Sequence, residues 1–249
     1  MKTSLNIIGL LSIILLASCT KKELAVDEPN QKCCTISPAV DAAYRQDAKV
    51  MVFREILMDS THADRNNPNL NTAEIDALLQ KINAVYRLNT PERDSVFSKH
   101  NIHAFPIGLR QMHFKVDTTA PEIQAFLAGQ PTGDARFDQL IQQYQIDSVK
   151  EAYSYPSFNW LYVTTSTDLN LLPVADQLEQ LPYIYVAEYG GFPIGDGNNI
   201  YWTESNGVTE LDFRIAWGDC PAGCIYRKHW VFEVDQNCNA TFVKVFKNY

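Results

Sequence analysis

Two cysteines near the C-terminus are spaced closely enough to form a disulfide bond. Cys220 and Cys224 enclose only Pro-Ala-Gly, and a turn with proline and glycine can bring their Cα atoms within the span that a disulfide requires. A redox pair would have two intervening residues at a helix N-terminus. A zinc site would need four ligands, and adding Cys238 and His229 completes that number at a spacing that matches no common zinc finger. The segment therefore favours a structural disulfide over metal binding or redox chemistry.

Short oxygen-bearing side chains occur in two glycine-containing loops of the same region. Asp196 and Asn198 follow Gly195, and Asp219 follows Gly218. Carboxylate and amide oxygens of this kind bind calcium, although in tight turns they more often hydrogen-bond their own backbone. If a cofactor binds, we expect calcium, with Asp196, Asn198 and Asp219 as its ligands. Together with His229, this is also where an enzyme would have its site.

Other patterns assign no catalytic residue. The sequence contains no nucleophile elbow, phosphate loop, dinucleotide fingerprint or HExxH zinc helix. His100 and His103 fall at the expected end of a helix and in a loop, where surface or capping roles are typical. Trp202, Trp217 and Tyr226 could bind a glycan or peptide, but aromatic residues in strands more often pack in the core.

The first part of the chain has the periodicity of helices. Apolar residues recur at spacings of three and four between residues 40 and 60. Asn71 with Glu74 resembles a capping box, and the stripe that follows to Tyr86 is the clearest amphipathic pattern of the chain. Thr90 followed by Pro91 begins a further short helix.

The middle region alternates between strand and helix patterns. Strands are predicted at residues 109–116, 146–153, 158–165 and 183–188, and helices at 121–127, 134–144 and 171–181. The order β-α-β-β-α-β is that of a ferredoxin-like sandwich, in which helices cover one face of an antiparallel sheet. The strand at 146–153 alternates only weakly.

The last 60 residues contain strands and turns. Strands are predicted at residues 199–204, 208–217, 225–235 and 239–246. The Asn206-Gly207 dipeptide is the strongest hairpin signal in the chain, so we expect an antiparallel meander. Alternation places Trp230, Phe232 and Val234 on its buried face. The predicted fold class is α+β: an α+β region at 39–189, with a β-meander at 190–249 packed on it.

The N-terminus predicts export and a lipid anchor. Residues 1–18 have a basic start, a short apolar run and a small-residue end, which is typical of a signal peptide. Leu16-Ala17-Ser18-Cys19 resembles a bacterial lipoprotein box, in which Cys19 is lipidated; the alternative is an ordinary secretory signal. Residues 19–38 are polar and aperiodic, as in a tether.

The cysteine count has a consequence for pairing. The chain has six cysteines, and lipidation of Cys19 leaves an odd number in an oxidising envelope, so one thiol is expected to be free or to pair between chains. Cys238 could reach Cys224, Cys33 or Cys34. The sequence leaves this connectivity open.

Composition excludes several classes of protein. The 249 residues are 46% hydrophobic and carry a formal charge of −8. This is a globular composition, neither disordered nor that of a multi-span membrane protein, and it argues against a nucleic-acid binder, which needs a basic face.

Two resemblances accompany these patterns. Trp217–Cys224, followed by Trp230–Val234 and Cys238, resembles a C-terminal motif of uncharacterised secreted proteins and lipoproteins of Bacteroidota, which implies an envelope location but no activity. The stretch Leu178–Glu188 is similar to the closing helix and strand of subtilisin propeptides and related inhibitors. Those proteins are ferredoxin-like and bind proteases through their sheet.

The sequence therefore predicts a lipoprotein, palmitoylated at Cys19 and anchored in the cell envelope, most consistently in the outer membrane. We expect a non-catalytic binding or structural module whose partner is a protein, a peptide or a glycan outside the cytoplasm. The alternatives are a protease inhibitor and an envelope enzyme that uses the region of Asp196, Asp219 and His229.

Overall fold

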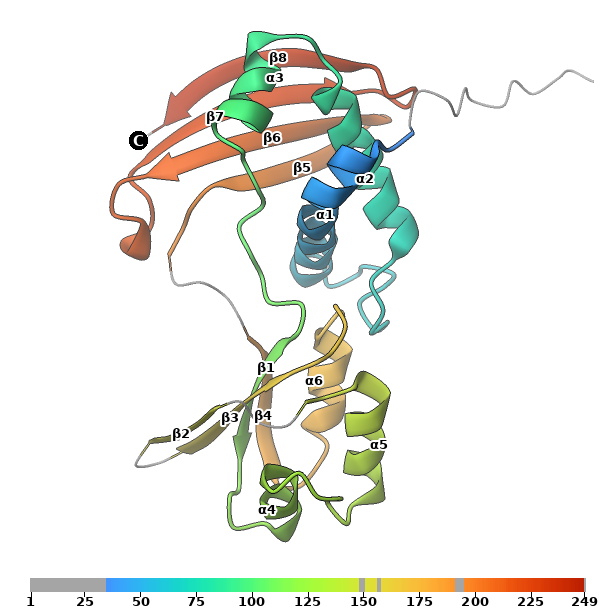
Figure 1. The fold of residues 1–249 in the computed structure, drawn as a ribbon, viewed down its shortest axis with the longest axis vertical. Helices are drawn as coiled ribbons and strands as arrows, with labels where there is room; N and C mark the ends of the chain where they lie inside the picture. The colour runs from blue at the N-terminus through green and yellow to red at the C-terminus, as the bar shows by residue number, and fades with distance from the viewer. Residues whose placement is uncertain (1–34, 148–150, 156–157, 191–194, 249) are drawn as a thin grey trace, which may run out of the picture.

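The computed structural model describes residues 35–147, 151–155, 158–190 and 195–248. It is an α+β protein with two separate four-stranded antiparallel sheets. Figure 1 shows the sheets at opposite ends of the molecule, with α1 to α3 beside one and α4 to α6 beside the other. Within the described ranges, no helix has the length and apolarity needed to cross a membrane.

Each of the first helices begins at a residue that caps it. The hydroxyl of Ser37 accepts a hydrogen bond from Val40 N–H at the start of α1 (Pro38–Met58). Asn71 caps α2 (Thr72–Tyr86) and also donates to the Glu74 carboxylate, which confirms the predicted capping pair. Thr90 caps α3 (Pro91–Asp94), which continues as the π-helix η2 (Ser95–Lys99).

The first sheet has the strand order β2-β3-β1-β4, with every neighbouring pair antiparallel. This is the predicted ferredoxin-like arrangement, with two helices in its first crossover. Its strands are β1 (Gln111–Val116), β2 (Glu151–Tyr155), β3 (Phe158–Thr164) and β4 (Ile184–Tyr189). Its helices are α4 (Pro121–Leu127), α5 (Ala135–Tyr144) and α6 (Leu172–Leu178).

The boundaries of the second predicted strand were wrong. Instead of spanning 146–153, β2 begins at Glu151, and Ile146 forms only an isolated bridge with Thr165. The reason is local, because α5 ends at Gln145 in a left-handed conformation, and the bridge then holds Ile146 beside the sheet.

The second sheet is the predicted meander. Its order is β5-β6-β7-β8, with β5 (Asn199–Ser205), β6 (Val208–Trp217), β7 (Tyr226–Val234) and β8 (Ala240–Asn248). Asn206 and Gly207 both have positive φ, as a two-residue turn of this hand requires. Trp230, Phe232 and Val234 are buried on one face, as alternation predicted.

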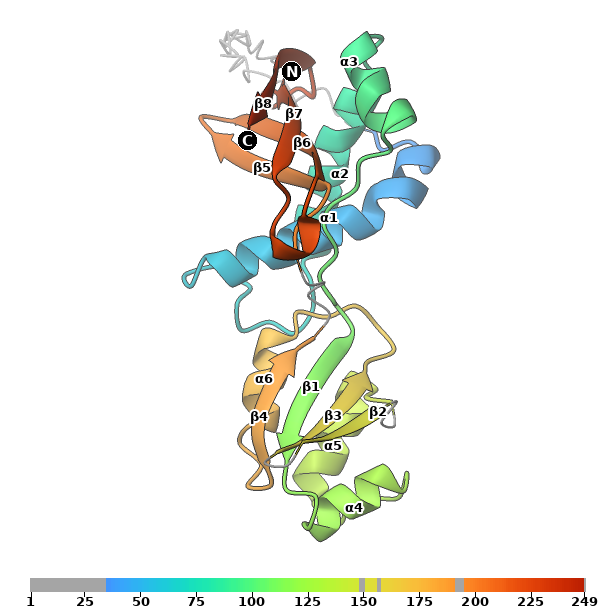
Figure 2. The ribbon, with the colours of Figure 1, turned by 90° about the vertical axis from the view of Figure 1, so that its left-hand side faces the viewer.

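Helices α1 and α2 pack on the second sheet, although residues 110–190 of the first sheet and its helices separate them in the chain. The buried apolar side chains of both parts nevertheless form one continuous cluster. The second sheet has two edge strands, β5 and β8. Helix α1 lies beside β5 and is seen nearly end-on below it in Figure 1 and lengthwise in Figure 2.

Candidate functional site

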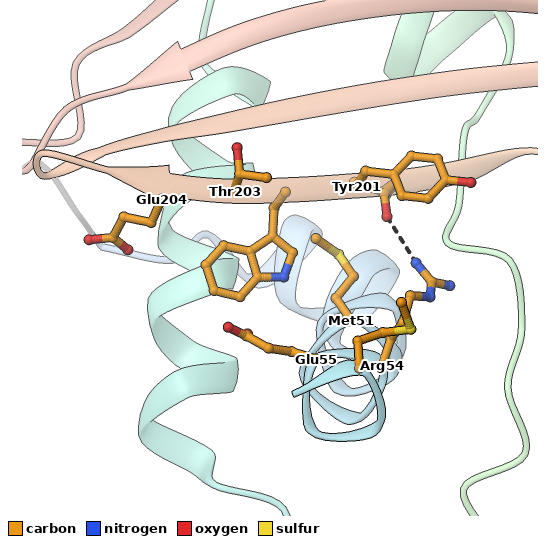
Figure 3. A pocket seen from close by; sticks show the side chains of 9 residues that line it. Met51, Arg54, Glu55, Tyr201, Thr203 and Glu204 are labelled. Atoms are coloured by element: carbon orange, nitrogen blue, oxygen red, sulfur yellow. Dashed lines mark hydrogen bonds between the residues drawn. The ribbon is translucent and has the colours of Figure 1, made fainter. Parts of the chain in front are cut away.

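A groove opens between α1 and the edge strand β5. Its main cavity has a volume of about 520 Å³ and lies between the segment Met51–Met58 of α1 and residues Ile200–Glu204 of β5 (Figure 3). A second cavity of about 210 Å³ lies between Glu55, Trp202 and the residues of α2 around Leu78. Glu55, Trp202 and Glu204 line both cavities, so the two form one groove, which we call the β5 groove.

Arg54 fixes the geometry of one wall. Its guanidinium donates to the Asn199 side chain at 3.1 Å and to the carbonyl oxygens of Ile200 and Phe105 at 3.2 and 3.0 Å. Burial lowers the pKa of Arg54, and the neighbouring Arg214 lowers it further. These bonds hold α1 against β5, so Arg54 braces the groove.

Two carboxylates of the groove, Glu55 on α1 and Glu204 on β5, have no ion-pair partner among the described residues. Burial raises the pKa of Glu55. Among the neighbouring charges, His62 has the largest effect and lowers this pKa, whereas Glu74, Asp59 and Glu204 each raise it. Among the described residues, no side chain or backbone group forms a hydrogen bond or an ion pair with the carboxylate of Glu55 or of Glu204. Three carboxylates (Glu55, Glu74 and Glu204) and two cations (Arg54 and Lys81) line the groove, which leaves an excess of one negative charge that a bound cation would relieve.

Apolar surface lies next to these carboxylates. The half-buried Trp202 indole lines both cavities, and Met51 and Met58 line the larger one. A tryptophan face attracts a cation, and methionine side chains adapt to ligands of different shape. An alkyl chain that ends in a positive charge matches this combination.

The backbone of β5 presents hydrogen-bonding groups at the same place. In an antiparallel pair, alternate residues direct their N–H and C=O groups away from the partner strand. At Ile200 these groups are occupied, because Arg54 donates to its carbonyl and the Asn199 side chain accepts from its N–H. In the described part of the chain nothing hydrogen-bonds the outward groups of Trp202 and Glu204. They are available to an added strand.

Two of the three predicted calcium ligands, Asp196 and Asn198, bind groups of the chain itself, and the third, Asp219, is exposed. Asp196 accepts hydrogen bonds from Arg214 and Arg227, and the Asn198 side chain accepts from Ala216 N–H. Burial alone would raise the pKa of Asp196, but the Gly197 N–H and the two guanidinium groups hold it below its ordinary value. Over the described ranges, no group of three or more His, Cys, Asp or Glu side chains is placed to hold a metal ion. Calcium binding by Asp196, Asn198 and Asp219 stays a prediction.

His229 has partners that sequence reasoning missed. Its Nδ1 lies 2.8 Å from the Asp212 carboxylate, and its Nε2 lies 3.1 Å from Oδ1 of Asn248. The buried imidazole stacks on Phe246 with 4.4 Å between ring centroids. Both ring nitrogens are therefore engaged in joining β6, β7 and β8, which gives His229 a structural role. The contact between His229 and Asp212 depends on the register of β6 against β7, which the loop lengths in the sequence left open.

The predicted disulfide forms between Cys220 and Cys224. Cys238 is also disulfide-bonded, which excludes Cys224 as its partner and leaves a cysteine outside the described residues. Cys19, Cys33 and Cys34 all lie outside those residues.

Trp202 was singled out in the sequence, whereas Glu55 was not. The available signal was that Glu55 follows Met51 by one helical turn, on the side of α1 that faces the groove. Comparison with known protein families, curated protein sequences and solved structures finds no match for this chain.

Proposed function

We propose that this protein is a binding module for an extended, basic segment of a partner protein, which adds as a strand to the free edge of β5. The observation that carries this proposal is the β5 groove, where the half-buried carboxylate of Glu55, which has no ion-pair partner among the described residues, adjoins an unpaired strand edge.

The backbone edge supplies affinity without sequence preference. A peptide strand beside β5 would hydrogen-bond the outward groups of Trp202 and Glu204, in the manner of β-strand addition. Arg54 occupies the corresponding groups near Ile200, so the added strand would begin beyond that residue.

The groove supplies selectivity. Alternate side chains of the added strand would point toward α1, where Glu55 and Glu204 favour a lysine or an arginine and Trp202 contacts its alkyl stem. Arg54 keeps its positive charge, but its three hydrogen bonds hold the guanidinium at the Ile200 end of β5, away from Glu204 (Figure 3).

The test uses two synthetic peptides of nine residues, one with alternating threonine and lysine and one with glutamate in place of each lysine. By isothermal titration calorimetry we expect the lysine peptide to bind and the glutamate peptide not to bind. Glu55→Gln should weaken binding about tenfold, the loss of one charge-assisted hydrogen bond.

Two matched variants separate the groove from general charge effects. Glu233→Gln removes an exposed charge on β7, away from the groove, and should leave binding unchanged. Glu204→Gln removes only the charge of Glu204, whereas Glu204→Pro removes both the charge and the outward backbone N–H. Glu204→Pro should therefore weaken peptide binding more than Glu204→Gln does. Equal binding of both peptides, or equal effects of Glu55→Gln and Glu233→Gln, would contradict the proposal.

We also propose that the protein is a lipoprotein of the cell envelope, related to the Bacteroidota proteins that it resembles. The supporting pattern is Leu16–Cys19, which lies outside the described residues. Radioactive palmitate should label the chain in its bacterial host, and Cys19→Ser should abolish the label and release the protein from the membrane fraction. Labelling that persists in the variant would refute this.

One observation favours protease inhibition as a second function. The first sheet has the ferredoxin-like order of subtilisin propeptides, and Leu178–Glu188 spans the end of α6 and most of β4. In Figures 1 and 2, α4 to α6 cover a single face of this sheet. Saturable inhibition of a subtilisin-like protease would support this function, and unaltered protease activity at excess protein would exclude it.

A further inference from the structure

A second surface, independent of the β5 groove, lies where β6 and β7 end at the disulfide loop. Trp217, Ile225 and Tyr226 have 42%, 49% and 40% of their surface exposed, respectively. The rings of Trp217 and Tyr226 stack with 5.7 Å between centroids. We call these three residues the apolar tip.

Within the apolar tip, Trp217 and Tyr226 lie on the side of the sheet that faces the helices, beyond the area they cover, and Ile225 directly precedes β7. Tyr226 lies four residues before the buried Trp230 on β7, and Trp217 lies four residues after the buried Phe213 on β6. Residues an even number apart in a strand point to the same face of the sheet, so each pair shares a face. Figure 1 shows no helix in front of this end of the sheet, to the left of α3. The side chains that would be core residues elsewhere on this face are here presented to the outside.

Two lysines lie on the same face of the sheet as Trp217 and Tyr226. Lys228 lies two residues from Tyr226 with its ammonium 4.4 Å from the Trp230 ring, and Lys247 is its register partner on β8. His100 packs on Trp230 from η2 with 5.3 Å between ring centroids. Burial lowers the pKa of His100, and its two charged neighbours, Lys99 and Lys228, lower it further. The field at His100 is therefore positive, although the chain as a whole is acidic and the disulfide loop itself carries the exposed Asp219.

The loop that carries the apolar tip is held in place from both sides. Cys220 and Cys224 close it covalently. The carbonyl of Cys220 accepts a hydrogen bond from Asp196 N–H, and Asp196 is itself held by Arg214 and Arg227. Little conformational freedom remains to be lost when the tip is bound.

We infer that the apolar tip, with Lys99, Lys228 and Lys247, is a contact site for an anionic phospholipid surface. Tryptophan and tyrosine are favoured at the interface between lipid and water, and lysines next to them attract acidic headgroups. The exposed Ile225 separates this ligand from a soluble polyanion, because a hydrocarbon side chain gains from burial among lipid chains and gains nothing from a sulfate or carboxylate group.

The experiment measures binding of the mature chain, beginning at residue 19 with Cys19→Ser, to vesicles. With this variant no acyl chain contributes to the affinity. We expect binding to vesicles of phosphatidylcholine with 30% phosphatidylglycerol and much weaker binding to phosphatidylcholine alone. Lys228→Gln and Lys247→Gln should each weaken binding roughly fivefold. Ile225→Ser should weaken it at least tenfold.

Tryptophan fluorescence measures how deeply Trp217 enters the lipid bilayer. Lipids that carry a spin label in the upper acyl chain should quench Trp217, and Trp217→Phe should lose that quenching while the unfolding temperature stays unchanged. Lys244→Gln and Tyr185→Ala are the matched controls, since Lys244 lies on the opposite face of β8 and the exposed Tyr185 lies on the first sheet. Neither should alter binding.

Three results would overturn the inference. They are equal binding to both kinds of vesicle, equal effects of Lys244→Gln and Lys247→Gln, and binding to heparin that Ile225→Ser leaves unaltered. The last would identify the surface as a site for soluble polyanions. Because the peptide titration uses no lipid and mutates the β5 groove, failure of either proposal leaves the other standing.

Discussion

Single residues of this protein illustrate why residue type alone does not define a site. Glu55 and Asp196 are both carboxylates near cations and aromatic rings, yet only Asp196 has its charge balanced by guanidinium groups of the chain. The predicted calcium ligands included Asp196 because of its glycine-containing loop. Nothing in the local sequence indicated that Arg214 and Arg227 would reach it from β6 and β7.

The first prediction concerns the stability effect of Glu55. Burial and neighbouring carboxylates raise the pKa of Glu55, so the folded state binds its proton more tightly than the unfolded state does. The resulting stabilisation is present at low pH and is lost as the pH rises through the raised value. Glu55→Gln should therefore increase the unfolding temperature at pH 7 to 8, and this difference should shrink toward about pH 4. A lower unfolding temperature at pH 7 would contradict the placement of Glu55.

His103 has a raised pKa because it forms a hydrogen bond with Asp47. Its Nδ1 lies 2.8 Å from the Asp47 carboxylate, whose other oxygen accepts from Ala104 N–H at 2.6 Å. The Asp47 bond raises the pKa of His103, while burial opposes this. The associated stability is complete below the ordinary value of about 6.5 and is lost as the pH rises through the folded value.

The second prediction follows from this sign. The unfolding temperature of the protein should fall between pH 6 and pH 8, and His103→Gln should flatten that fall. Thermal unfolding monitored by circular dichroism measures both. His113→Gln is the control, since His113 is half-buried on β1, away from Asp47, and should leave the slope in place. An unaltered slope in His103→Gln would refute the assignment.

Elements were predicted well where a capping residue or a two-residue turn fixes them. Asn71 and Thr90 begin helices, and Asn206-Gly207 joins β5 to β6, because each of these signals acts within a few residues. The second strand of the first sheet was misplaced, because the left-handed residue Gln145 ends α5 and Ile146 then forms an isolated bridge with Thr165, and the sequence pattern signalled neither. The β5 groove could not be predicted at all, because α1 and β5 are far apart in the chain.

The third prediction compares the two disulfide bonds. The Cys220–Cys224 disulfide closes a loop of only five residues, so its removal increases the entropy of the unfolded chain little. Cys220→Ser with Cys224→Ser should therefore lower the free energy of unfolding by about 2 kcal/mol. If Cys238 pairs with Cys33 or Cys34, its loop has roughly 200 residues, and Cys238→Ser should cost about 5 kcal/mol. Urea denaturation measures both losses.

Thiol mapping tests the same pairing independently. In the mature chain with Cys19→Ser, alkylation without reduction should modify one of Cys33 and Cys34 and neither Cys220 nor Cys224. Modification of Cys238 would show that it is unpaired in solution, and modification of Cys220 and Cys224 would return metal binding and thiol chemistry to consideration.

At the scale of the whole molecule, the two parts are joined by a few buried polar contacts. Lys49 of α1 forms an ion pair of 2.6 Å with Asp168, which precedes α6. The fully buried Asn170 donates through Nδ2 to the carbonyl oxygens of Asp64, Arg65 and Asn67, at 3.0, 3.2 and 2.8 Å. Its own N–H donates to the Pro68 carbonyl at 2.9 Å. One side chain thus fastens the loop between α1 and α2 to the part that contains the first sheet.

The last prediction is that Asn170 determines whether the two parts unfold together. Asn170→Ala removes a donor from three carbonyl groups of half-buried residues, of which, in the described part of the chain, only that of Asp64 keeps another, from Asn67 N–H, and this should cost about 3 kcal/mol. Because the lost bonds lie between the parts, calorimetry should show the single transition of the native chain separate into two, with the part containing the first sheet unfolding at the lower temperature. Asn237→Ala, at an exposed position in the turn between β7 and β8, should leave one transition. If Asn170→Ala lowers the unfolding temperature while the protein still unfolds in one step, the continuous apolar cluster rather than Asn170 couples the two parts.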